Sequence, residues 1–137
     1  MSATPIDTSL VTLLKNAADV TAIVSTRIYA TQAPQGAALP CIVYVREDGQ
    51  REAFMHMTGS TGYVRATYTV SCLATSLSTC RNLARAARRV LQFARGSAIR
   101  LARVTADQDL QEAPTSGEQL PTYRTDLSVE LTYVETV

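Results

Sequence analysis

A chain of 137 residues has the size of one domain and can bury a core without disulfides or metal ions. Charged residues make up 18% of the chain, below the roughly 25% of an average domain, so we expect part of the surface to be covered in an assembly. The formal net charge of +1 excludes a general attraction to nucleic acid or to acidic membranes.

The basic residues are twelve arginines and the single lysine Lys15. Arginine keeps its charge and makes bidentate contacts, which suits protein interfaces and phosphates better than lysine does. A coding sequence rich in G and C would produce the same bias without any function. Both interpretations stay open at this stage.

The chain has three cysteines, an odd number, and their spacing matches no metal-binding motif. We therefore expect Cys41, Cys72 and Cys80 to be small core residues in a reducing compartment. The N-terminus has no basic start followed by an apolar run, so no signal peptide is predicted. No apolar stretch is long enough to span a bilayer. These features predict a protein made in a cytoplasm, without a membrane partner.

The first elements in chain order are two helical segments and a short strand. Asp7 or Thr8 is expected to cap a first helix, and a second helical turn is expected over Val20 to Val24. A short strand follows from Arg27 to Ala30. The apolar stripe of the first helix comprises Leu10, Val11, Leu13, Leu14 and Ala17.

An irregular loop then joins that strand to an apolar strand over Cys41 to Glu47. Pro34 and Pro40 each fix the backbone dihedral φ, whereas Gly36 allows backbone conformations that other residues resist. The Ala30–Pro40 loop holds no histidine, carboxylate, lysine or serine, which indicates docking rather than catalysis. Residues 48–62 are predicted to form a long connection that packs on a partner through its apolar side chains, Phe54, Met55 and Met57.

The second half of the chain alternates with a period of two in its strands. A strand over Tyr63 to Ala74 precedes the longest helix, which is expected from Ser76 or Ser78 to about Ala94 and to end before Gly96. The remaining segments are a strand over Ile99 to Ala106, an acidic turn, a loop over 113–121 and a strand over Tyr123 to Tyr133. We predict one α+β domain over 1–137, a mostly antiparallel sheet of four to five strands with two helices packed on one face.

No residue pattern supports catalysis, a metal ion or a cofactor. The only histidine, His56, lies between two methionines and has no partner for a metal site or a triad. Asp107, Asp109 and Glu112 could offer oxygen ligands to calcium, but the glycine of a calcium loop is absent, so a solvated acidic turn is favoured. No phosphate-binding glycine loop is present. The chain is predicted not to be an enzyme.

One charge pattern stands out on the long helix, where arginines recur opposite the apolar stripe. They are Arg81, Arg85, Arg88 and Arg89. These side chains could form a docking face for an acidic partner or for a DNA backbone. They could equally form a solvated helix face, whose last arginines also suit the helix dipole.

Three blocks of the sequence, in this order, resemble the tail terminator proteins of tailed phages, also called tail completion or head–tail joining proteins. The blocks are the run from Arg27 to Tyr44, the run from Gly62 to Cys72 with the helix after it, and the run from Tyr123 to Tyr133. The family often has an aromatic residue and a tryptophan where this chain has Cys41 and Leu73.

The resemblance implies a structural virion protein of the tail or neck region, made in a bacterial host. It implies a ring, usually of six subunits, that caps the tail tube, ends its polymerisation and meets the head connector while DNA passes through its channel. Interface residues would then be Tyr29, Pro34, Gln35, Phe54, Met55 and Met57. A head-side connector, a minor tail protein or a small nucleic-acid-binding regulator using the arginine helix remain alternatives.

Overall fold

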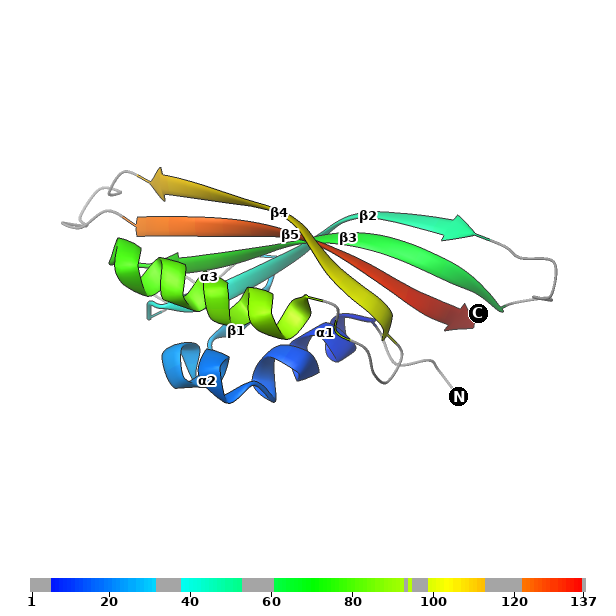
Figure 1. Cartoon of the computed structure of the whole chain (residues 1–137), viewed down its shortest axis with the longest axis horizontal. Helices are drawn as coiled ribbons and strands as arrows, with labels where there is room; N and C mark the ends of the chain where they lie inside the picture. The colour runs from blue at the N-terminus through cyan, green and yellow to red at the C-terminus, as the bar shows by residue number, and fades with distance from the viewer. Residues whose placement is uncertain are drawn as a thin grey trace.

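The computed structural model describes residues 6–31, 38–52, 61–92, 94, 99–112 and 122–136. These residues form three α-helices and five strands (Figure 1). The helices are α1 (Ile6–Lys15), α2 (Ala18–Val24) and α3 (Leu77–Leu91). The strands are β1 (Ile28–Ala30), β2 (Cys41–Glu52), β3 (Thr61–Ala74), β4 (Ile99–Glu112) and β5 (Thr122–Thr136).

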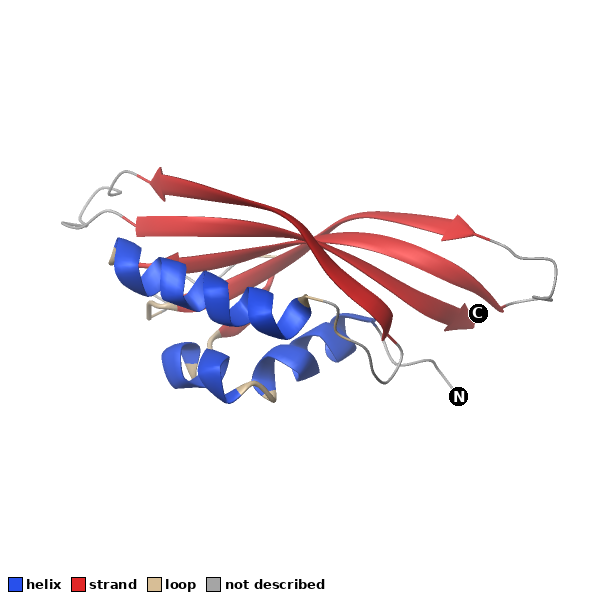
Figure 2. Ribbon diagram, in the orientation of Figure 1, coloured by secondary structure: helices blue, strands red, loops and turns tan. Residues whose placement is uncertain are grey.

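The strands form one sheet in the order β1-β2-β3-β5-β4. β1 runs parallel to β2 over three residue pairs, and every other neighbouring pair is antiparallel. Figure 2 shows that the helices cover one face of this sheet. The expected α+β class is therefore confirmed, with a mixed sheet of five strands and with three helices in place of two.

The alternation predicted for β3 and β5 places one face of each strand in the core. On β3 the buried residues are Val64, Ala66, Tyr68, Val70 and Cys72. On β5 they are Thr125, Leu127, Val129, Leu131 and Tyr133. Because successive strand residues point to opposite faces, the residues between them form the other face of the sheet, which the helices leave uncovered.

The helices bury their apolar stripes against the covered face. α3 follows Ser76, whose side chain makes no capping bond, and it buries Cys80, Leu83, Ala87 and Leu91. It ends at Leu91, short of the expected Ala94, while Gly96 lies outside the described residues. α1 buries Leu10 and Leu14 completely. Each helix is too short to be stable alone, so burial against the sheet holds it in place.

The first helix starts earlier than predicted, at Ile6. Asp7 consequently lies inside the first turn, and its carboxylate accepts a hydrogen bond from the hydroxyl of Tyr68 instead of capping the helix. The short segment after it forms a separate helix, α2, which buries Val20 and Val24. The helical turn expected over Val20 to Val24 is therefore present as a helix of seven residues, which makes three helices beside the sheet where two were expected to pack on it.

The strands β2 and β4 are longer than the apolar runs from which they were predicted. β2 continues to Glu52 and β3 begins at Thr61, so the expected connection over 48–62 is strand at both ends. Backbone pairing with β3, which includes Gln50 opposite Arg65, sustains this polar part of β2. β4 likewise runs to Glu112, so the acidic residues expected in a turn lie on a strand paired with β5. Pairing with a neighbouring strand, which periodicity cannot reveal, decides these boundaries.

Among the described residues, no helix is long and apolar enough to cross a membrane. The same part of the chain contains no group of three or more histidine, cysteine, aspartate or glutamate side chains arranged to hold a metal ion.

Candidate interaction surface

The arginine face of α3 is a surface on which four positive charges gather. Arg81, Arg85, Arg88 and Arg89 are all exposed, as expected for side chains opposite a buried stripe. Arg81 pairs with Asp109 of β4 at 3.3 Å, and Arg89 pairs with Asp19 of α2 at 3.5 Å. Both pairs are exposed, so each contributes little to stability.

The side chains of Arg85 and Arg88 make no ion pair or hydrogen bond with another described residue. They line a groove of about 780 Å³ between α3 and β4. The other lining residues are Arg89, Gln92, Val104, Thr105, Ala106 and Asp107. The structure thus brings the arginines predicted from sequence together with an acidic residue that was predicted to lie in a turn.

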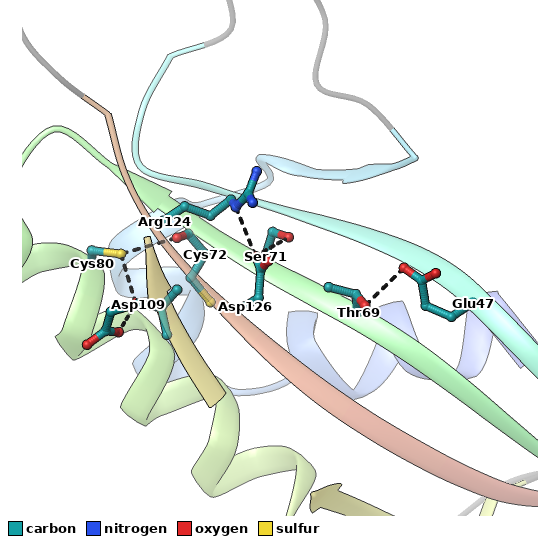
Figure 3. A network of polar contacts seen from close by, with 9 residues as sticks. Glu47, Thr69, Ser71, Cys72, Cys80, Asp109, Arg124 and Asp126 are labelled. Carbon is teal, nitrogen blue, oxygen red and sulfur yellow. Dashed lines mark hydrogen bonds and ion pairs between the residues drawn. The ribbon is translucent and has the colours of Figure 1, made fainter. Parts of the chain in front are cut away.

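A polar chain fixes α3 against the sheet beside this groove (Figure 3). The Cys80 thiol donates to the carbonyl oxygen of Cys72 at 3.2 Å and lies 3.3 Å from the hydroxyl of Thr125. That hydroxyl donates to Asp109 at 2.8 Å. Asp109 in turn pairs with Arg81, so a buried thiol and an exposed arginine are linked through two strands.

The three cysteines are free and buried, as predicted. Burial raises the pKa of each thiol above its ordinary value, and for Cys80 the hydrogen bond with Thr125 opposes that shift. A thiol with a raised pKa is a poor nucleophile and a poor metal ligand near neutral pH. These groups therefore serve packing.

Polar side chains also occupy the uncovered face of the sheet. Ser71 donates to Asp126 at 2.7 Å, and Asp126 pairs with Arg124 at 3.1 Å (Figure 3). Thr69 donates to Glu47 at 3.0 Å. The charges of Arg124 and Asp126 thus compensate each other within β5, while the hydroxyls of Ser71 and Thr69 connect β3 to carboxylates on its two neighbouring strands.

The model of a protein family described as tail completion protein gp17 matches residues 8–133, almost the whole chain. The chain belongs to this family. The suspected resemblance is confirmed, and a structural role in a phage tail follows for this tail completion protein. A chain from the "Virion of native gene transfer agent (GTA) particle" has the same fold, with a TM-score of 0.68, 15% identity and 91% of each chain covered. No curated protein sequence matches.

The structure places one of the six expected interface residues of this tail completion protein. Tyr29 is half-buried on β1, the outermost strand beside β2. The remaining five, Pro34, Gln35, Phe54, Met55 and Met57, lie outside the described residues, as do His56 and residues 113–121. The Arg27 guanidinium donates to the carbonyl oxygens of Pro40 at 2.8 Å and Ile23 at 3.2 Å, which anchors the chain on both sides of Tyr29.

Sequence reasoning missed the groove between α3 and β4, because no pattern within either segment specifies how the two lie relative to each other. The run of arginines did signal one wall of the groove.

Proposed function

We propose that this tail completion protein forms a ring, with six subunits, that caps the tail tube, ends tube polymerisation and joins the tail to the head connector. DNA passes through the ring without sequence-specific binding. The family match over residues 8–133 carries this proposal. The fold shared with a chain of a gene transfer agent virion supports placement in a phage-like particle.

Two kinds of surface would make the contacts. The segments around Tyr29, Pro34 and Gln35, and the apolar arm with Phe54, Met55 and Met57, would contact a neighbouring subunit or the tube. The groove lined by Arg85 and Arg88 would take an acidic surface of a partner or face the channel, because exposed arginines without a partner among the described residues are available for bidentate contacts.

Electron microscopy and native mass spectrometry of the purified protein, alone and with tail tube protein, test this function. We expect closed rings and tubes of defined length capped at one end. A chain that stays monomeric at high concentration, and leaves tube polymerisation unchanged, would contradict the proposal.

A nucleic-acid-binding regulator is the second candidate, favoured by the exposed arginines along the groove. Binding to duplex DNA at several salt concentrations separates the two. A steep salt dependence that disappears in the Arg85→Ala and Arg88→Ala variants would favour the regulator. A shallow dependence, unchanged by these substitutions, would favour the ring.

A further inference from the structure

The two walls of the groove between α3 and β4 carry opposite charges that do not pair with each other. Arg85 and Arg88 are exposed on the helix wall, and Asp107 is exposed on the strand wall. Among the described residues, none of these three side chains forms an ion pair or a hydrogen bond. A groove of about 780 Å³ thus keeps charges of both signs available to a ligand, and its volume is in the usual range of binding sites.

The other charges beside the groove already have partners. Arg81 pairs with Asp109 at 3.3 Å, and Arg89 pairs with Asp19 at 3.5 Å. The two arginines that remain are three residues apart on α3, so they are neighbours on the helix surface. The available positive charge is therefore concentrated within one turn of the helix.

Gln92 adds a donor group whose direction is fixed. The backbone N–H of Val104 donates to Oε1 of Gln92 at 2.9 Å. Because a backbone N–H can only donate, the amide oxygen must face Val104, and the NH₂ group forms the other end of the amide. Gln92 is half-buried and lines the groove, and its NH₂ group has no acceptor among the described residues. Together with the two guanidinium groups, this amide forms a set of N–H donors suited to carboxylate and carbonyl oxygens.

Asp107 decides which kind of acidic partner fits this groove. A DNA strand carries a negative phosphate at every nucleotide, so a strand that follows the arginines also brings phosphates close to the Asp107 carboxylate, which repels them. A polypeptide segment can carry carboxylates for the arginines and a lysine or arginine for Asp107. Electrostatic complementarity therefore favours protein over DNA.

We propose that the groove binds a polypeptide segment of the head connector that carries charges of both signs. Carboxylates of this segment pair with Arg85 and Arg88, and an oxygen atom accepts from the amide of Gln92. A basic side chain of the segment pairs with Asp107. The proposal rests on the joining role proposed above, in which the segments around Tyr29 and the apolar arm already serve subunit and tube contacts.

Removing the charge of Asp107 separates the two kinds of partner. The full-length protein is titrated with purified head connector protein and, separately, with a short DNA duplex. We expect Asp107→Asn to weaken connector binding about fivefold or more, since a basic group of the connector loses its partner. A groove that binds DNA would instead hold the duplex more tightly after this change. Glu47→Gln removes the same charge at an exposed position outside the groove and should bind the connector like the wild type.

Gln92→Glu tests the donor set without removing the bond to β4. The new side chain still offers an oxygen to the N–H of Val104, but a carboxylate oxygen replaces the NH₂ group. We expect connector binding to weaken about tenfold or more, because this oxygen repels the acceptor of the connector. Lys15→Gln changes the net charge by the same amount outside the groove and should bind normally. Melting curves of all variants show whether the fold is intact.

Connector affinity that is unchanged in either groove variant would overturn the proposal. Tighter binding of the duplex by Asp107→Asn, with unchanged connector binding, would assign the groove to DNA. Both groove variants should still form rings and capped tubes, because no ring contact is placed in the groove. A wild type that forms no ring, or that does not bind the connector, would instead contradict the function proposed above.

Discussion

The hydroxyl of Tyr68 connects the centre of the sheet to the first helix. Tyr68 is 1% exposed, and its hydroxyl donates to the carboxylate of Asp7. Burial, followed by the hydrogen bond and the charge of Asp7, raises the pKa of the phenol well above its usual range. A single residue thus links α1 to β3, and it does so through a polar contact that the apolar pattern of β3 does not reveal.

Replacing this tyrosine should cost stability at neutral pH. Tyr68→Phe keeps the buried ring but leaves the Asp7 carboxylate without its donor, so we expect the free energy of unfolding to fall by about 1 to 3 kcal/mol. Urea denaturation measures the change. An unchanged denaturation midpoint would show that water replaces the hydroxyl without loss.

The raised pKa of Tyr68 also predicts a loss of stability in alkali. The folded chain holds this proton more tightly than the unfolded chain, whose phenol titrates near pH 10. The stabilising contribution is therefore complete below about pH 10 and decreases as the pH rises further. The pKa of Tyr44 is raised by burial and by Asp7, so it acts in the same direction. Melting curves between pH 8 and pH 11 should fall more steeply for wild type than for Tyr68→Phe; parallel curves would contradict the assignment.

At the scale of elements, the period of the apolar residues predicted the strands and helices that contribute a complete face to the core. β3, β5 and α3 follow this rule, because each buries one continuous stripe. It failed at the ends of β2 and β4, where polar residues such as Asp109 pair through the backbone. The groove could not be predicted from the apolar period either, since it is formed by two separate elements, α3 and β4.

α3 offers a matched pair of leucines for testing how burial stabilises this element. Leu83 is fully buried in the core, while Leu77 at the start of the helix is 39% exposed. We expect Leu83→Ala to reduce the free energy of unfolding by about 2 to 5 kcal/mol, from lost transfer energy and the cavity left behind. Leu77→Ala should change it by no more than about 0.5 kcal/mol. Thermal unfolding of both variants measures the difference, and equal losses would mean that α3 does not pack on the sheet as described.

At the scale of the whole molecule, a net charge of +1 gives no general attraction to any partner. Recognition must therefore come from local surfaces, and two candidates differ in place. The segments around Tyr29, Pro34 and Gln35 would join copies of the chain, as proposed above, whereas the groove along α3 would hold a different partner. The proposed ring needs both kinds of surface, so substitutions in them should separate assembly from joining.

The groove should be needed for joining. We expect Arg85→Glu combined with Arg88→Glu to leave the melting temperature and the capped tubes unchanged, because both side chains are exposed and have no described partner to lose. The same variant should join heads at least tenfold less efficiently, since reversed charges repel an acidic partner surface. Tails assembled with it, mixed with DNA-filled heads and counted as infectious particles, measure this. Lys15→Glu, a single charge reversal at an exposed position outside the groove, is the control and should join heads normally. Normal joining by the arginine variant would show that the groove is only a solvated surface.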